Sequence, residues 1–283
     1  MHHVGKLASV APVAEGVYGG HADACARFPI VGRGAGAVHQ SIDIVELGPR
    51  GRVDRHAHAF EEGVYVLEGA VRLSLAGEVE ELAADDTCFI EKGVVHQLES
   101  SRATTARWLE LHAPQPGAQG LEDTVFPDGD LAGEAPGLPY RRGCFDEAEL
   151  PPPSSALGLA GFGEANVGGA SLEMLIDREF GASQFYLFVV QYGPGGFIKE
   201  HDHPFEEAFL FLSGEIEAVL DDVTYTLGAG DYCWSGVGSM HALTNRGEEP
   251  VRWIETQVPQ PPSRHQARFK ADWARTIGAV LPA

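Results

Sequence analysis

The sequence predicts an all-β protein built from two tandem barrels. The chain of 283 residues contains 35 glycines and 18 prolines, a composition that suits short strands joined by tight turns, as in a β-sandwich or jelly roll. A pattern of histidine, glutamate, tryptophan and glycine also occurs twice, with a constant shift of 145 residues. A chain of this length has room for two domains of ordinary size, each with its own core.

The repeat keeps its register across the residues best suited to chemistry. Two sets of three histidines and one glutamate are related by the shift, namely His56, His58, Glu62 and His96 in the first copy and His201, His203, Glu207 and His241 in the second. The C-terminal ends of the two repeated segments agree as well, because Trp108-Leu109-Glu110 in the first copy corresponds to Trp253-Ile254-Glu255 in the second. A repeat of this length predicts two copies of one fold.

The spacing of the second set predicts a metal site. The two histidines of the HDH triplet share one face of an extended strand because side chains alternate. A straight strand would carry Glu207 about 13 Å beyond His203, so we expect Pro204 to bend the chain and Glu207 to open the next strand. His241 arrives from a later strand. Three imidazoles and one carboxylate suit a divalent transition metal and leave two coordination positions for a bidentate substrate, or for substrate and dioxygen.

This stretch resembles the two signature motifs of the cupin superfamily. The motif positions in the second copy are held by Gly195, His201, His203, Glu207, Gly214, Gly230, Gly236, Gly238, His241 and Asn245. Gly236 stands where the family has a proline. In the first copy the ligand residues are kept, whereas Arg50, Asp85, Glu91 and Ser100 replace other motif positions. The resemblance implies a bicupin with two double-stranded β-helix (jelly-roll) barrels and a metal site in each.

The composition along the chain predicts the domain boundaries. We expect an N-terminal barrel at residues 1–117, an interdomain segment at 118–169 and a C-terminal barrel at 170–283. The interdomain segment contains the proline-rich and glycine-rich runs PDGDLAGEAPGLPYRRG and FDEAELPPPSSA. It is long for a simple loop, so we expect it to pack along both barrels.

The last part of the chain predicts a short C-terminal helix. The sequence SRHQARFKADWARTIG follows Pro262, with Ser263 as an N-cap and Phe269 in an apolar stripe. Its basic residues form either a solvated helical face or a contact in a homo-oligomer.

The walls of the two predicted pockets differ. Val64 and Val66 share the inward parity of Glu62, whereas Phe209 and Phe211 hold these positions in the second copy. The phenylalanines either fill the barrel core or contact a substrate. We assign Glu207, Phe209 and Phe211 as the candidate catalytic residues and expect catalysis mainly in the second barrel.

Charge and cysteine content limit the partners. A formal net charge of -21 argues against nucleic acid and anionic membranes, which are bound mainly by lysine and arginine. The N-terminal sequence lacks the features of a signal peptide, and no apolar run approaches the length of a membrane span. The four cysteines show no metal-binding spacing and are interpreted as reduced thiols. We therefore expect a cytoplasmic protein that acts on a small molecule.

Three classes of function fit these observations. The leading hypothesis is a metal-dependent oxygenase of the dioxygenase type, because resemblance to cupins implies enzymes such as the quercetin dioxygenases. The alternative is a non-oxidative decarboxylase or hydrolase, as in oxalate decarboxylase or ureidoglycine aminohydrolase, with Glu61 or Glu206 as a proton carrier. Both glutamates, however, have the parity opposite to that of the ligands, which favours an outward-facing position or a structural role.

The third class is a metal-containing small-molecule sensor or binding protein. The resemblance favours manganese or iron in each site, with nickel, copper, cobalt or zinc as alternatives, since ligand identity alone does not name the metal.

Overall fold

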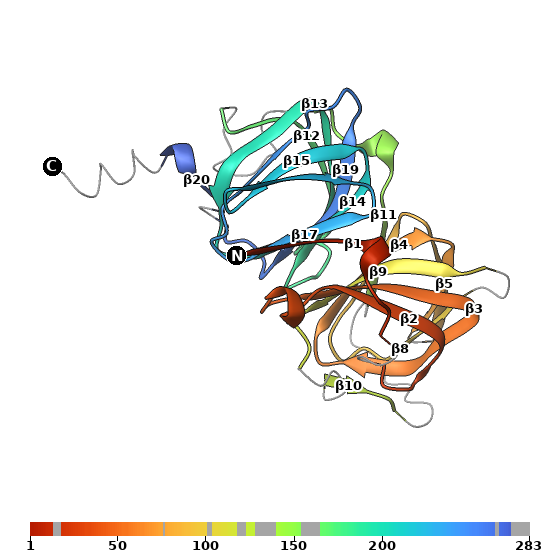
Figure 1. Ribbon diagram of the computed structural model, residues 1–283. Coiled ribbons are helices and arrows are strands. Elements are labelled where there is room, and N and C mark those ends of the chain that lie inside the picture. The colour runs from red at the N-terminus through yellow and green to blue at the C-terminus, as the bar shows by residue number, and fades with distance from the viewer. Residues whose placement is uncertain are drawn as a thin grey trace. The chain divides into compact units, whose positions relative to one another are not determined.

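The computed structural model describes residues 1–13, 18–75, 77–100, 104–117, 123–127, 140–153, 165–263 and 266–272. Strands are by far the commonest regular secondary structure in these residues, which confirms the predicted all-β fold class. The chain divides into two compact units, each seen as a curled sheet in Figure 1. We call the unit of Ser9–Asp146 and Leu175–Tyr186 the N-terminal barrel, and the unit of Met1–Ala8, Glu147–Met174 and Leu187–Ala283 the C-terminal barrel.

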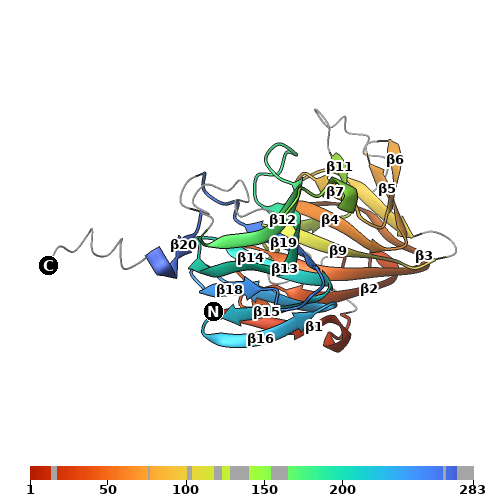
Figure 2. The same ribbon diagram turned by 90° about the horizontal axis from the view of Figure 1, so that it is seen from above.

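The N-terminal barrel contains a ten-stranded sheet. Its strands are β2 (Ala22–Val31), β3 (Ser41–His58), β4 (Glu61–Glu68), β5 (Ala70–Leu75), β6 (Glu78–Ala83), β7 (Asp86–Ile90), β8 (His96–Ser100), β9 (Ala106–Ala113), β10 (Thr124–Val125) and β11 (Tyr140–Cys144). The order is β11-β7-β4-β9-β3-β8-β5-β6, and β2 and β10 also pair with β3. The β5–β6 hairpin at one end of this order is visible in Figure 2.

The C-terminal barrel contains a second ten-stranded sheet. Its strands are β1 (His2–Lys6), β12 (Val167–Ile176), β13 (Tyr186–Asp202), β14 (Glu206–Ser213), β15 (Glu215–Leu220), β16 (Val223–Gly228), β17 (Asp231–Ser235), β18 (His241–Thr244), β19 (Val251–Val258) and β20 (Arg268–Phe269). The order is β1-β17-β14-β19-β13-β18-β15-β16, and β12 and β20 also pair with β13.

Short 3₁₀ helices occur in both barrels, at Leu7–Ser9, Arg33–Ala35 and Glu147–Glu149.

The two sheets repeat each other strand for strand. A shift of 145 residues carries the bounds of β4, β5, β6, β7 and β9 onto those of β14, β15, β16, β17 and β19. Both copies also have a cis peptide bond before the proline that follows the last of these strands, at Ala113-Pro114 and Val258-Pro259. The internal repeat in the sequence is therefore a repeat of structure.

Segments outside the repeat complete the sheet edges. Strand β1 at the N-terminus pairs with β17, and β11 from the interdomain segment pairs with β7. Residues Met1–Ala8 thus belong to the C-terminal barrel, and Leu175–Tyr186 belong to the N-terminal barrel. These compact units differ in extent from the barrel ranges 1–117 and 170–283, which stay a prediction.

The predicted helix after Pro262 is wrong in its first part. Arg268 and Phe269 form β20, which pairs with Asp202 and His201 at the end of β13. The Arg268 guanidinium binds the buried Asp202 carboxylate, and this ion pair holds the segment extended. Helical structure begins only at Lys270, and the predicted helix from residue 273 onward lies outside the described residues.

The motif substitutions in the first copy preserve the loop conformations of the second. Arg50 and Asp85 have φ angles of 62° and 71°, and their repeat partners Gly195 and Gly230 have 74° and 82°. These are left-handed conformations in which glycine is favoured and aspartate is tolerated. Arginine does not favour this conformation, yet Arg50 adopts the same left-handed turn as Gly195.

The replacement of asparagine by serine also preserves a loop. Ser100 Oγ accepts a hydrogen bond from Gly51 N at 2.9 Å and donates to Gly48 O at 2.5 Å. In the second copy Asn245 Nδ2 donates to Gly193 O at 3.0 Å. Both side chains therefore tie the last ligand-bearing strand to the same bend in the long central strand.

Each barrel interior is packed with apolar side chains. Trp108, Trp234 and Trp253 are at most 1 % exposed. Cys88 and Cys233 are fully buried, as expected for thiols that serve in packing. The alternation of buried and exposed residues, as along Val71, Leu73 and Leu75 of β5, is the pattern of strands with one face toward a core.

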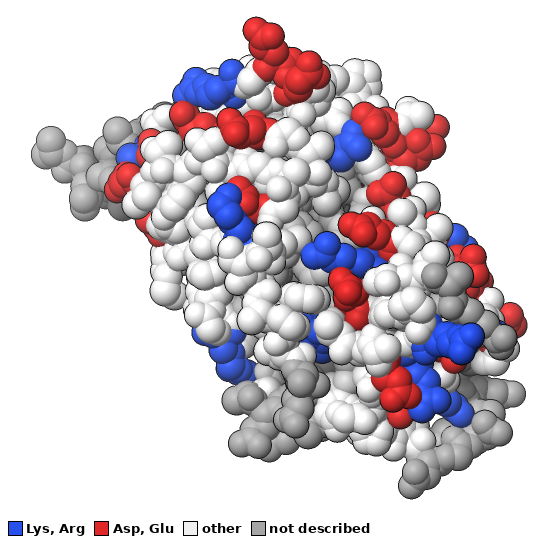
Figure 3. Space-filling view, turned by 45° about the vertical axis from the view of Figure 1, so that its right-hand side comes forward, with Lys and Arg blue, Asp and Glu red and all other residues white. Residues whose placement is uncertain are grey.

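The visible surface mixes both signs of charge. Figure 3 shows acidic and basic side chains interspersed on the face it presents. Within the described residues, no helix combines the length and apolar character needed to cross a membrane.

The left-handed turns give a paired test of the repeat. Arg50→Gly should raise the free energy of unfolding by about 0.5–1 kcal/mol, because glycine removes the cost of a side chain at positive φ. Gly195→Ala should lower it by about 1 kcal/mol, since nothing lies within 4 Å of the added Cβ and only the backbone term acts. Chemical denaturation measures both. Destabilisation by Arg50→Gly would show that the turns at Arg50 and Gly195 are not stabilised in the same way.

Candidate metal centres

The candidate ligands of the N-terminal barrel come from three strands. His56 and His58 lie at the end of β3, Glu62 is the second residue of β4, and His96 begins β8. All four side chains are at most 4 % exposed, and one donor atom from each lies within 4.8 Å of the others. The structure thus brings together the four residues predicted from the sequence.

The C-terminal barrel gathers its four candidates in the same way. His201 lies near the end of β13, His203 follows that strand, Glu207 is the second residue of β14, and His241 begins β18. The chain bends at Pro204 between the two strands, so Glu207 Oε2 lies 2.9 Å from His203 Nε2 and 3.1 Å from His241 Nε2. These four donor atoms also lie within 4.8 Å of one another.

A β-bulge directs the first histidine of each set. The pairing register shifts between Val53 and His56 in β3 and between Ile198 and His201 in β13. A bulge bends its strand and re-aims the side chains that follow. As a result the first and last histidines face each other, with ring centroids 4.1 Å apart in the N-terminal barrel and 4.2 Å in the C-terminal barrel.

Each ligand histidine is oriented by a hydrogen bond at Nδ1. The partners are Asp54 O at 2.7 Å for His56, Thr124 Oγ1 at 2.9 Å for His58, Val94 O at 3.0 Å for His96, Lys199 O at 2.8 Å for His201, Phe205 O at 2.7 Å for His203 and Ser239 O at 3.0 Å for His241. A carbonyl only accepts hydrogen bonds, so it places the ring proton on Nδ1 and leaves the Nε2 lone pair for a metal.

The inner atoms of each cluster are suited to a cation. Within the part of the chain that the structure describes, Nε2 of His56, His58 and His96 and both Glu62 oxygens are buried without a hydrogen-bond partner, as are Nε2 of His203 and His241. Buried polar atoms are normally paired, and lone pairs of neutral imidazoles that face a carboxylate repel it. A divalent metal among them removes both problems. The two clusters therefore fit divalent metal ions.

Electrostatics keep the carboxylates charged. Burial opposes ionisation of Glu62 and Glu207, yet the surrounding imidazoles outweigh it and hold both pKa values well below the usual range. Burial and the neighbouring imidazoles lower the pKa values of His56 and His201 well below theirs. For His96, burial is outweighed by Glu62, which raises its pKa. The charged carboxylates and the neutral rings of His56 and His201 match the protonation that ligation requires, whereas His96 would release its proton when it binds a metal.

The surroundings of the N-terminal centre include a buried polar network. Arg27 forms ion pairs with Glu110 and Asp43, and Tyr18 donates a hydrogen bond of 2.5 Å to Glu110 Oε1. The Tyr18 ring packs edge-on against His56 at 5.2 Å. Asp43, Glu110 and His112 also have donor atoms close enough to hold a metal, but the Arg27 guanidinium already supplies positive charge to both carboxylates.

The C-terminal centre has a different environment. Gln257 Nε2 donates to Glu207 Oε1 at 2.8 Å and to Glu255 Oε1 at 3.3 Å, and Trp253 Nε1 donates to Glu255 Oε2 at 2.9 Å. Burial raises the pKa of the Glu255 carboxyl well above its usual range, and the Glu207 charge raises it further. Gln257 therefore connects the ligand carboxylate to a second buried carboxyl.

The buried residues beside the two candidate centres could be predicted only in part from the sequence. Glu110 and Glu255 carried a signal, because they correspond in the repeat. Tyr18 and Arg27 lie before the part of the first copy in which the sequence pattern is repeated, and only the three-dimensional structure places them beside Glu110.

The four pocket-wall candidates lie in the barrel interiors. Val64 and Val66 are fully buried among the core residues of the N-terminal barrel. In the C-terminal barrel Phe209 lies 6.3 Å from the His241 ring, and Phe211 lies 5.8 Å from Trp253. Phe209 therefore borders the ligand set directly, whereas Phe211 lies beside the tryptophan.

Glu61 and Glu206 have structural contacts. The Glu61 carboxylate accepts hydrogen bonds from Ser183 N and Gln184 N at 3.0 and 2.9 Å, and the Ser183 hydroxyl also donates to it. Glu206 accepts a bond of 3.4 Å from Trp234 Nε1. Both carboxylates are buried, on the strand face opposite to the ligands.

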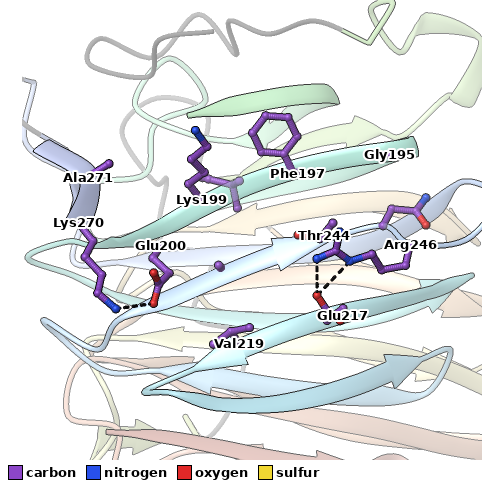
Figure 4. Close-up of a pocket in the computed structure, with 13 residues that line it drawn as sticks. Gly195, Phe197, Lys199, Glu200, Glu217, Val219, Thr244, Arg246, Lys270 and Ala271 are labelled. Carbon is purple, nitrogen blue, oxygen red and sulfur yellow. Dashed lines mark hydrogen bonds and ion pairs between the residues drawn. The ribbon is translucent and has the colours of Figure 1, made fainter. Parts of the chain in front are cut away.

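A groove on the C-terminal barrel is separate from the ligand clusters. Its volume is about 770 Å³, and its walls come from β13, β15, β18 and the residues after β20. Figure 4 shows Phe197, Val219 and Thr244 along it, with the Lys270–Glu200 and Arg246–Glu217 ion pairs on its sides. None of the eight candidate ligands lines it.

Comparison with protein families identifies both copies. The Cupin domain family matches residues 43–112 and 188–256, and each match includes a complete set of four ligand candidates. The fold and sites thus define a double-barrel protein with two metal-type centres. The chain belongs to the cupin superfamily and is a bicupin.

Two curated relatives and two solved structures extend this comparison. The chain is 28 % identical over 102 residues to the tetracenomycin polyketide synthase protein TcmJ of Streptomyces glaucescens, covering 35 % of this chain and 68 % of that protein. It is 28 % identical over 117 residues to protein SchB of Streptomyces halstedii, covering 40 % and 85 %.

The structural similarity extends over both barrels. Oxalate decarboxylase from Bacillus subtilis has a TM-score of 0.65 and 14 % identity, covering 99 % of this chain and 82 % of that one. The Lactobacillus farciminis enzyme has a TM-score of 0.65 and 15 % identity, covering 99 % and 93 %. At this identity the likeness establishes the fold alone.

The two centres should bind metal independently. We expect close to two divalent ions per chain in the wild type and close to one in His96→Ala or His241→Ala, because each substitution removes a ligand from one cluster only. Elemental analysis after loading with manganese, iron, nickel, copper, cobalt or zinc measures this. Loss of both ions in either variant would contradict independence, and no binding of any metal would contradict both sites.

Proposed function

We propose that the protein is a metal-dependent oxygenase of the dioxygenase type, acting on a small aromatic or dicarbonyl substrate in the C-terminal barrel. Manganese or iron is the proposed ion in each centre. When bound, the ion supplies Lewis acidity and a change of oxidation state. The ligand residues hold it, and the surrounding side chains select and orient the substrate.

Phe209 in the wall of the C-terminal centre carries this proposal, because Val64 holds its place in the N-terminal barrel, whereas a phenylalanine stacks on a ligand histidine in both barrels. Phe205 stacks on His203 with ring centroids 3.9 Å apart, Phe269 stacks on His201 at 5.3 Å, and Phe209 lies 6.3 Å from His241. Such rings favour a flat apolar substrate over a small, strongly hydrated one. Phe209 is the proposed substrate contact, and Phe211 supports it from the side of Trp253.

The polar side of the same centre adds to the argument. Gln257 fixes the orientation of Glu207 through its bond of 2.8 Å, and Glu255 lies behind it. A dianion such as oxalate gains no countercharge from a glutamine, a glutamate and phenylalanines, whereas a phenol or diketone needs none. This difference favours an oxygenase substrate at this centre.

The relatives support a substrate class. TcmJ carries polyketide synthase in its name, and polyketides are rich in phenols and 1,3-dicarbonyl groups. Two oxygen atoms in such a group form a bidentate ligand for a metal with open coordination positions. We therefore place aromatic polyketides and their fragments first among the substrates, and the identity over 35 % of the chain makes this a proposal about class only.

The second candidate is a non-oxidative decarboxylase or hydrolase. The specific observation in its favour is the shared fold with oxalate decarboxylases over 99 % of the chain. The buried Arg27 would be the cation to bind a carboxylate substrate at the N-terminal centre, but Asp43 and Glu110 already neutralise it. Glu61 and Glu206 are engaged in structural hydrogen bonds. This alternative therefore ranks second, and a metal-containing sensor or binding protein ranks third.

Oxygen uptake and carbon dioxide release distinguish these classes. The holoprotein, loaded in turn with manganese and iron, should consume oxygen with one or more members of a panel of catechols, flavonols, diketones and aromatic polyketide fragments. Carbon dioxide release from oxalate without oxygen uptake would establish the alternative. Tight binding of a panel member without turnover of any would favour a sensor.

The choice of barrel has its own test. With any substrate of that panel, Glu207→Ala should lower kcat by about 100-fold or more, because it removes a metal ligand and the acceptor of Gln257. Glu62→Ala should retain most of the turnover. Metal content and circular dichroism of both variants serve as controls for lost folding. Full turnover in Glu207→Ala together with inactivity in Glu62→Ala would place catalysis in the N-terminal barrel.

A further inference from the structure

One ligand histidine differs from the other five in how its ring is held. The six ligand histidines all belong to the described residues, and five of them have Nδ1 bonded to a backbone carbonyl oxygen. His58 Nδ1 instead lies 2.9 Å from the side-chain hydroxyl of Thr124. The repeat partner of His58 is His203, whose Nδ1 is bonded to Phe205 O at 2.7 Å. The two centres therefore differ at one defined atom.

Thr124 reaches His58 from the interdomain segment. It begins the two-residue strand β10, which pairs with β3 so that Thr124 lies opposite His58 and Val125 lies opposite Ala57. Two further bonds hold this strand, because Ala59 N donates to Asp123 O at 2.8 Å and Gly117 N donates to the Asp123 carboxylate at 2.5 Å. The Thr124 side chain is buried.

An aromatic stack anchors the other end of the strand. The Phe126 ring lies 3.8 Å from the His21 ring in a stacked geometry and 5.9 Å from the ring of the ligand His56. The short strand and the residue after it thus lie against two candidate ligands of the N-terminal centre, through the Thr124 hydroxyl on His58 and the Phe126 ring beside His56.

The chemistry of the hydroxyl explains why this contact matters. When Nδ1 of His58 carries the proton, the Thr124 oxygen accepts it and the Nε2 lone pair is available to a metal. A valine at this position would fill the same space without accepting a hydrogen bond. The buried Nδ1–H would then lose its partner, and the ring would no longer be held in the ligating tautomer and orientation.

We propose that Thr124 is a positioning residue of the N-terminal metal centre and that the interdomain strand β10 is a functional part of that centre. This inference goes beyond the proposed function, because it depends only on metal binding and holds for any reaction. It assigns to one residue of the interdomain segment a specific role in the metal affinity of one barrel.

Metal affinity in single-site protein tests the proposal. The full chain carrying His241→Ala has only the N-terminal centre intact, and Zn²⁺ competition against a chromogenic chelator gives its dissociation constant. Thr124→Val in this background should raise that constant about 10-fold to 100-fold, the range for loss of a hydrogen bond to a metal-ligating histidine. Thr124→Ser keeps the hydroxyl and should stay close to the parent.

A matched substitution in the same barrel serves as the control. Thr87 is fully buried on β7, and its hydroxyl has no hydrogen-bond partner among the described residues, so Thr87→Val should leave the dissociation constant unchanged. If Thr124→Val does not fold, Thr124→Ala and Thr124→Ser provide the same comparison, since they differ only by the hydroxyl. Equal affinity in the folded hydroxyl-free and hydroxyl-bearing variants overturns the proposal, as does an equal loss in Thr87→Val.

Discussion

The burial of a carboxylate among three imidazoles is the constraint on which each barrel depends. Removing a charged group from water costs several kcal/mol in a real protein, and the cost is recovered only through close partners. Here the long central strand, the bulge before its first histidine and the bend after its last bring one acidic and three basic side chains to a single point. Without a cation, each neutral ring whose Nδ1 carries the proton directs its Nε2 lone pair toward Glu62 or Glu207. A divalent ion turns this unfavourable arrangement into a stable one.

The two copies keep this arrangement and differ in what surrounds it. In the N-terminal barrel, Arg27 neutralises Glu110, so the second buried carboxylate is paired with a fixed cation. In the C-terminal barrel, Glu255 accepts a hydrogen bond from Gln257, and Phe209 stands where the N-terminal barrel has Val64. A tryptophan donor to the second carboxylate and a phenylalanine stacked on a ligand histidine are common to both barrels. Duplication thus preserved the ligands while the outer residues diverged, as expected when two domains take on different roles.

Much of this architecture could be predicted from the sequence because the repeat and the ligand spacing are local properties. Strand parity and the bend at Pro204 place Glu207 next to His203 without any knowledge of distant contacts. The helix predicted at Phe269 does not form, because pairing with β13 and the ion pair between Arg268 and Asp202 outweigh the helical periodicity of the sequence. Thr124 could not be predicted, since only the tertiary fold brings the interdomain segment to His58. Local patterns predicted the candidate ligands that the structure brings together, and long-range contacts determine how their side chains are held.

The central claim is that each barrel holds one divalent metal ion between its three histidines and its glutamate. Anomalous diffraction from a manganese-loaded crystal, measured at the metal absorption edge, tests it most directly. The account predicts two peaks per chain, one within bonding distance of His56, His58, Glu62 and His96 and the other within bonding distance of His201, His203, Glu207 and His241. Peaks elsewhere, or four-residue clusters without a peak in a fully loaded crystal, would contradict it.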